Sequence, residues 1–258
     1  MNAAKQKLAD GGLVLCMSLR QARSLDVVMV AAAAGFDCMY VDLEHSPLSL
    51  ETASTLCVGS IALGITPLVR VPSHSHDWVS RVLDGGAQGV IVPHVNSADE
   101  ARAVVSAARF PPLGRRSVMG PSPALAYRSM PLAEVNATLN RDTLMIVMIE
   151  TPQAVERADE IAAVDGIDML LIGSNDLCTE MGIPGQLRDP KLLQAYEHVA
   201  AVCAARGRHL GVGGVRGDPE LQKRLLGLGS RFIIGGSDMS YLATATAADV
   251  RTLRSLVP

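Results

Sequence analysis

Two acidic side chains follow the ends of two apolar runs, in a pattern that suits metal chemistry. The run "LMIVMIE" ends at Glu150, and "DMLLIGSND" ends at Asp176. Carboxylates without a neighbouring cysteine or histidine suit a hard divalent ion such as Mg²⁺ or Mn²⁺, which keeps several of its waters. The alternative is that each acid caps the helix that follows it. Two such acids on successive runs favour the metal site over the capping role.

Three more groups of polar residues lie at the ends of apolar runs. "VDLEHSP" supplies Asp42 and His45, and a histidine there suits a general acid or base, although a lone histidine is more often structural. Arg70 lies inside the apolar "PLVRVP" and must meet an anion, which is either a structural carboxylate or a developing oxyanion. The backbone N–H groups of "GSND", residues 173–176, can bind a substrate carboxylate at the start of a helix.

The elements that position these residues are short apolar runs that alternate with helix-compatible stretches. Because the runs are nearly continuous in apolar residues, they indicate parallel strands covered on both faces. The predicted strands are 14–18, 38–42, 67–71, 89–93, 144–150, 168–173, 209–214 and 232–236. Eight such units predict a (β/α)₈ barrel with the polar residues at one end. A doubly wound open sheet is the alternative, but neither GxGxxG nor GxxxxGK[ST] follows the first run.

Helix signals and spacing complete this outline. Ser24 is a candidate N-cap for the helix after the first strand, and Pro152 suits a first helical turn. Asn96 or Ser97 forms a capping pair with Glu100 nearby. The stretches 94–143 and 174–208 are long, which predicts enlarged loops after the fourth and sixth strands. Without any low-complexity linker, residues 1–258 are expected to form a single domain.

Composition excludes several classes of protein. Of the 258 residues, 48% are hydrophobic and 19% charged, which allows a sizeable core. A net charge of −3 without a long basic run argues against nucleic acid as the main partner. The five cysteines show no CxxC spacing and indicate reduced thiols. No apolar run reaches the ~20 residues of a membrane span, so we expect a cytoplasmic protein without a membrane partner.

The motifs together resemble one family. They are "AGFDCMYVDLEHSPLS", "PLVRVP", "LDGGAQGVIVPHVNSADEA", "FPPLGRR", "MIETPQAVE", "GIDMLLIGSNDLCTEMG" and "GSRFIIGGSDMSYL", and they cover most of residues 12 to 242. The chain is similar to the HpcH/HpaI aldolases, the metal-dependent (class II) pyruvate aldolases. The resemblance implies a modified TIM barrel that forms a homo-oligomer, typically a hexamer whose dimers exchange the C-terminal helix.

The resemblance also implies the metal site and part of the substrate site. Glu150 and Asp176 match the residues that hold the divalent ion, which is Mg²⁺, Mn²⁺ or Co²⁺. Pyruvate chelates that ion, and its carboxylate meets backbone amides of the loop that matches Gly173, Ser174 and Asn175.

The resemblance assigns further roles to four residues. Arg70 matches the residue that stabilises the pyruvate enolate, and Asp42 matches a residue near the aldehyde. His45 matches the proton-transfer residue and Asp84 its acidic partner. Asp84 precedes the fourth strand and so belongs towards the opposite end of a simple barrel, unless an irregular short helix or another subunit brings it to His45. No lysine lies at a predicted strand end, which disfavours a Schiff base.

These roles imply a carbon–carbon lyase that reversibly cleaves a 4-hydroxy-2-oxo acid to pyruvate and an aldehyde through a metal-stabilised enolate. The alternatives are a citrate-lyase-β-like enzyme acting on a CoA thioester, and a binding protein without activity. The sequence departs from many relatives at Met148, where they carry glutamine, and at Ser117, in "GRRS". Both departures concern the acceptor side of the pocket more than the enolate chemistry.

Overall fold

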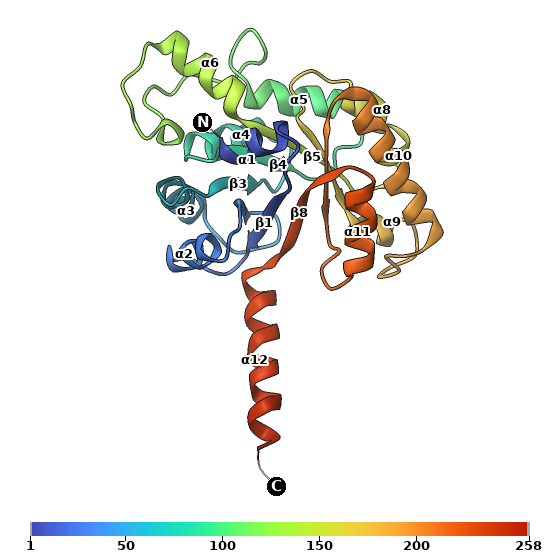
Figure 1. Ribbon diagram of the computed structural model, residues 1–258. Coiled ribbons are helices and arrows are strands. Elements are labelled where there is room, and N and C mark those ends of the chain that lie inside the picture. Colours follow the sequence, from blue (N-terminus) through green and yellow to red (C-terminus); the bar gives the residue numbers. More distant parts are fainter. Residues whose placement is uncertain (1, 257–258) are drawn as a thin grey trace.

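The computed structural model describes residues 2–256, and in this range eight parallel strands close into a barrel in the order of the sequence (Figure 1). The last strand pairs with the first, so the sheet has no open edge. The closed ring excludes the doubly wound sheet. The strands are β1 (Val14–Leu19), β2 (Cys38–Asp42), β3 (Thr66–Arg70), β4 (Gly89–Val92), β5 (Leu144–Ile149), β6 (Met169–Gly173), β7 (His209–Gly213) and β8 (Ser230–Ser237).

Helices follow the strands and surround the barrel, which confirms the predicted (β/α)₈ architecture. They are α1 (Ala3–Ala9), α2 (Asp26–Ala33), α3 (Leu50–Ala62), α4 (His76–Asp84), α5 (Ala98–Ala108), the 3₁₀ turn η1 (Pro123–Leu125), α6 (Leu132–Asp142), α7 (Pro152–Glu156), α8 (Ala158–Ala162), α9 (Ser174–Glu180), α10 (Pro190–Arg206), α11 (Pro219–Gly227) and α12 (Asp238–Arg254).

Each strand packs against two separate cores, which explains the continuous apolar runs. Alternate residues fill the inside of the barrel, and the residues between them face the surrounding helices. The inner core includes Val14, Cys16, Tyr40, Leu68, Ile91, Ile146, Met148, Leu171 and Phe232. The outer core includes Val41, Val69, Val90, Val147, Leu170 and Val212.

Helix α1 belongs to the N-terminal end of the barrel, where its buried Ala4 and Leu8 extend the inner core. Lys5 bonds to the Thr143 carbonyl oxygen at 2.9 Å and pairs with Asp168 at 2.8 Å, so the helix is tied to the starts of β5 and β6. With that end filled, the opposite end is the open one.

Two of the helix caps behave as expected and one does not. The Ser97 hydroxyl accepts from the Glu100 N–H at 3.2 Å, and Pro152 occupies the first turn of α7. Ser24 was expected to cap α2, but the helix starts after Leu25 without a side-chain cap, and the Ser24 hydroxyl donates to the Asp26 carboxylate at 2.8 Å instead.

The long stretch 94–143 does not enlarge the C-terminal face of the barrel, contrary to the prediction of a long loop after the fourth strand. Helix α5 begins soon after β4, and the extra chain with η1 and α6 lies between α5 and β5. Arg109 bonds there to the Thr143 carbonyl and to Asp168, which precede β5 and β6. This extension therefore covers the N-terminal end of the barrel.

Helix α12 projects away from the barrel (Figure 1). None of its residues is buried, and it exposes the large apolar side chains Met239, Leu242, Val250 and Leu253. Among residues 2–256, no helix combines the length and apolar character needed to cross a bilayer.

Candidate active site

The two-residue period of the strands carries four polar side chains into the mouth of the barrel. Tyr40, Leu68 and Met148 point into the barrel as part of its inner core. Two positions further along the same three strands come Asp42, Arg70 and Glu150, whose side chains therefore point to the same side. Likewise Arg20 lies two residues after the inward Ser18 of β1. Because all strands are parallel, these side chains gather at one end.

The structure excludes the capping role for both acids of the predicted metal pair. Thr151, not Glu150, caps α7, because its hydroxyl accepts from the Ala154 N–H at 3.0 Å. Asp176 lies inside the first turn of α9, and Gly173 is the N-cap residue there. Neither carboxylate is needed to cap a helix.

Glu150 is a buried carboxylate with an unusual neighbourhood. It is 1% exposed, and its Oε2 accepts the His94 backbone N–H at 3.0 Å. Burial, together with the nearby negative charge of Asp176, raises the pKa of Glu150 to about 7, although the hydrogen bond and charge of His94 act in the opposite direction. The carboxylates of Glu150 and Asp176 repel each other, and a divalent cation bound between them would remove that repulsion.

The backbone of β6 passes directly beneath Glu150. A Cβ added at Gly173 would lie 2.4 Å from Glu150 Oε1, so only glycine leaves space for the carboxylate. Asp176 follows one turn later on α9. Within residues 2–256 no group of three or more acidic, histidine or cysteine side chains is arranged around a metal position. The donor set is thus two carboxylates, which suits an ion that completes its shell with water and substrate oxygens.

This contact gives a prediction for Gly173→Ala. The added methyl group would push the Glu150 carboxylate from its place, so we expect divalent-metal affinity to fall by at least ~10-fold, as for the loss of groups that orient metal ligands. Titration calorimetry with Mn²⁺ measures the effect. Gly227→Ala is the matched control, since a Cβ there meets nothing within 4 Å. Equal metal affinity in both variants would contradict this placement of Glu150.

Arg70 is buried and paired with Asp42 from the neighbouring strand. The two residues are register partners in β2 and β3, and the guanidinium donates from Nε to Oδ1 at 3.0 Å and from Nη2 to Oδ2 at 2.6 Å. Burial alone would raise the pKa of Asp42, but the hydrogen bonds and charge of Arg70 hold it below its usual value. The pair fixes the guanidinium across the barrel mouth, and of its five N–H groups two are committed to Asp42.

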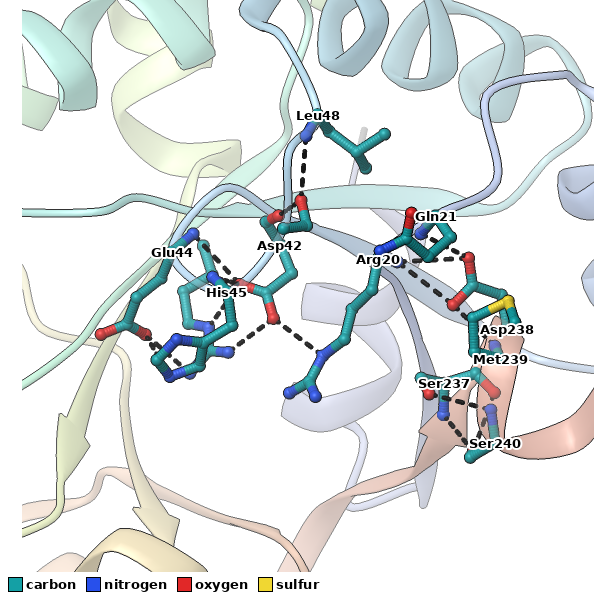
Figure 2. Close-up of polar contacts among 12 residues, drawn as sticks. Arg20, Gln21, Asp42, Glu44, His45, Leu48, Ser237, Asp238, Met239 and Ser240 are labelled. Atoms are coloured by element: carbon teal, nitrogen blue, oxygen red, sulfur yellow. Dashed lines mark hydrogen bonds and ion pairs between the residues drawn. The ribbon is translucent and has the colours of Figure 1, made fainter. Parts of the chain in front are cut away.

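Asp42 also organises the loop after β2. Its Oδ1 accepts the backbone N–H groups of Glu44 at 3.2 Å and His45 at 3.1 Å, and its Oδ2 accepts Arg20 Nε at 3.0 Å. Figure 2 shows His45 and Arg20 on opposite sides of this carboxylate. The His45 ring is half-exposed, and its Nε2 is 3.7 Å from Glu44 Oε2. The His45 ring is therefore accessible to solvent at the open end.

A second histidine at this end was missed from the sequence. His94 lies two residues after the end of β4, and its ring is 3.4 Å from Glu44 Oε1 and 3.5 Å from Glu150 Oε2. Its φ of 51° lies in the left-handed region, and from this conformation its N–H donates to Glu150. Its position after a strand end was a usable signal, but the two acids beside it are distant in sequence.

One cavity of about 260 Å³ brings most of the predicted site together. It lies at the barrel mouth, and Met148 forms part of its wall as the last inner-core residue below Glu150. The lining residues include the predicted Arg70, Gly173, Ser174, Asn175 and Asp176, together with Arg20, Tyr40 and Arg216. Arg20 and Arg216 were not singled out from the sequence.

Asp84 is not part of this assembly within residues 2–256. It ends α4, and its Oδ1 accepts Arg116 Nη2 at 2.7 Å. The C-terminal end of a barrel helix lies at the N-terminal end of the barrel, so Asp84 is separated from His45 of the same chain, in keeping with its place before the fourth strand.

Fold and site together define a (β/α)₈-barrel enzyme whose open end combines the carboxylates of Glu150 and Asp176 with a buried arginine. The family model described as HpcH/HpaI aldolase/citrate lyase matches residues 17–245. The chain belongs to this family.

Named relatives and a solved structure agree with that assignment. The chain is 41% identical over 245 residues to 4-hydroxy-4-methyl-2-oxoglutarate aldolase tasA from Hapsidospora irregularis, covering 94% of this chain and 91% of the relative. It is 34% identical over 247 residues to 4-hydroxy-2-oxo-heptane-1,7-dioate aldolase from Salmonella typhimurium, covering 96% and 92%. The crystal structure of an HpcH/HpaI aldolase from Desulfitobacterium hafniense matches with a TM-score of 0.92 and 32% identity, covering 97% and 96%.

Proposed function

We propose that this protein is a divalent-metal-dependent class II aldolase that reversibly cleaves a 4-hydroxy-2-oxo acid to pyruvate and an aldehyde. The observation that carries the proposal is the buried Glu150 beside Asp176, with Arg70 lining the same barrel mouth. The relatives reported above are named as aldolases of this substrate class. A lyase acting on a CoA thioester is less favoured, because those named relatives are aldolases.

Cleavage next to a carbonyl requires that the leaving carbon's charge be stabilised as an enolate. A divalent ion held by Glu150 and Asp176 would act as a Lewis acid and stabilise negative charge on the keto oxygen. Arg70 adds a fixed positive charge there, and its pairing with Asp42 keeps it in place without reorganisation during the reaction.

The remaining residues bind substrate and move protons. The first-turn N–H groups of α9, at Ser174 and Asn175, have no intrahelical acceptors and are available to the pyruvate carboxylate. His45 is accessible at the open end and suits proton transfer at the 4-hydroxyl group. Asp42 holds the loop that carries His45, in addition to Arg70.

We also propose that the active form is an oligomer, such as a hexamer, in which α12 is exchanged between subunits. Supporting this, α12 extends from the barrel with no buried residue and exposes Met239, Leu242, Val250 and Leu253. A helix with such a face gains stability only by packing against another surface.

Metal removal tests the proposed function directly. We expect exchange of the pyruvate methyl protons with D₂O, followed by ¹H NMR, to require Mg²⁺, Mn²⁺ or Co²⁺ and to stop on addition of EDTA. The same metals should support pyruvate release from a panel of 4-hydroxy-2-oxo acids in a coupled assay. Undiminished exchange after complete chelation would overturn the metal-dependent mechanism.

A further inference from the structure

The loop after β1 is tied to the start of α12 by a single carboxylate. Because β1 pairs with β8, the segments that follow these two strands leave the barrel side by side. There the Asp238 carboxylate accepts three successive backbone N–H groups (Figure 2). They belong to Arg20 at 3.2 Å, Gln21 at 2.9 Å and Ala22 at 2.7 Å. Converging N–H groups form a site for an anion, and the protein fills this one with its own side chain.

Asp238 has no other evident task in the fold. Helix α12 is capped by Ser237, whose hydroxyl accepts the Ser240 N–H at 3.2 Å, while the Ser240 hydroxyl accepts the Ser237 N–H at 2.8 Å. Within residues 2–256, Asp238 is not among the residues that line the cavity at the barrel mouth. Burial acts to raise the pKa of Asp238, but its backbone hydrogen bonds hold that pKa below its usual value. The carboxylate therefore serves to hold the loop after β1.

The loop that Asp238 holds brings Arg20 to the partner of Arg70. Arg20 Nε donates to Asp42 Oδ2 at 3.0 Å, and the same oxygen accepts Arg70 Nη2 at 2.6 Å. Asp42 is fully buried, so its negative charge is shared between two guanidiniums with little screening by water. Without Arg20, the whole charge of Asp42 would oppose that of Arg70. The positive field that Arg70 offers to an enolate oxygen would then be weaker.

We propose that Asp238 is a positioning residue for the reaction, which acts through Arg20 on the Asp42–Arg70 pair. This rests on the proposed aldolase function, in which Arg70 stabilises the enolate. The contacts run from the first residue of α12 through the loop after β1 to the ends of β2 and β3. The C-terminal helix thus supports the active site although its own residues lie outside the barrel.

A double-mutant cycle on pyruvate proton exchange tests the proposal. We expect Arg20→Leu and Asp238→Asn each to lower kcat ~10-fold and to leave KM for pyruvate nearly unchanged, since pyruvate keeps its other contacts while Arg70 is less well supported. The double variant should be no slower than Arg20→Leu alone, because Asp238 acts only through Arg20. Mn²⁺ affinity should stay normal in all three variants, which a general loss of structure would not allow.

Asp249→Asn is the matched control, because Asp249 is an exposed acid further along α12, and it should leave kcat and KM unchanged. Arg20→Leu keeps the backbone contacts of Asp238, so a near-normal kcat in this variant would overturn the proposal even if Asp238→Asn does not fold. A double variant much slower than Arg20→Leu would also overturn it, since Asp238 would then act by another route.

Hydrogen–deuterium exchange, followed by mass spectrometry, separates this proposal from the aldolase function. The backbone amides of residues 20–22 should be protected in the unaltered protein and in Asp249→Asn. In Asp238→Asn they should exchange at least ~10-fold faster, the size expected for loss of a hydrogen bond to a charged group. Unchanged protection there would overturn the anchoring of the loop. Absence of pyruvate exchange in the unaltered protein would instead overturn the aldolase function, and with it the part of Arg70, but not the anchoring.

Discussion

Replacing Arg70 by alanine is expected to lower the rate of pyruvate proton exchange by ~10²–10³, the usual cost of removing an oxyanion donor. Arg70 is 4% exposed and lines the cavity, and the two hydrogen bonds of its guanidinium to Asp42 hold it there. Its charge acts on the oxygen that becomes negative. The loss should therefore fall on kcat more than on KM, and steady-state exchange kinetics by NMR separate the two.

The Arg70→Ala variant also leaves Asp42 buried with only Arg20 as a cationic partner, so folding must be followed beside activity. Arg70→Lys retains a positive charge but loses the bidentate contact with Asp42. Compared with Arg70→Ala, it should restore more of the folding stability than of the exchange rate. Arg102→Ala removes an arginine from an exposed ion pair with Asp99 and serves as the surface control. A folded Arg70→Ala protein with near-normal exchange would show that Arg70 only neutralises Asp42.

Replacing Glu150 by glutamine is expected to abolish metal-dependent exchange and to weaken Mn²⁺ binding by at least ~100-fold. Removing a direct ligand should lower metal affinity at least as much as removing a residue that only orients a ligand. Glutamine keeps the shape of the side chain and removes its charge. Glu180→Gln, at an exposed acid on α9, serves as the control and should bind metal normally. Normal Mn²⁺ affinity in Glu150→Gln would remove Glu150 from the metal site.

The raised pKa of Glu150 gives this prediction a pH signature. In the metal-free protein the carboxyl group takes up a proton as the pH falls through about 7, well above its ordinary value, because it is buried. The ion binds the deprotonated form, so apparent affinity should be constant above that pH and fall ~10-fold per unit below it. Binding at pH 6 should release a proton, which calorimetry in buffers of different ionisation enthalpy detects. An affinity that is flat from pH 5.5 to 8 would contradict this.

The outline of the barrel was readable from the sequence because each strand is buried on both faces. The predicted strands 38–42 and 89–93 match β2 and β4 to within a residue, as continuous apolar runs mark such strands plainly. Glu150 and Arg70 were found for the same reason: a polar residue at the end of such a run must face the barrel mouth. Ser24 is not the cap because α2 begins one residue later than predicted, which makes Leu25 the N-cap residue.

Only the tertiary structure decided how residues far apart in sequence meet. His94 lies beside Glu44 and Glu150 because three different strands end at one mouth, and no local pattern shows that. Arg216, from the loop after β7, lines the same cavity and stacks on Tyr241 of α12. The sequence by itself determined the barrel and the places of Glu150 and Arg70 at strand ends, since strand period and burial are local properties. Partners across the barrel mouth depend on ring closure, which is a property of the whole chain.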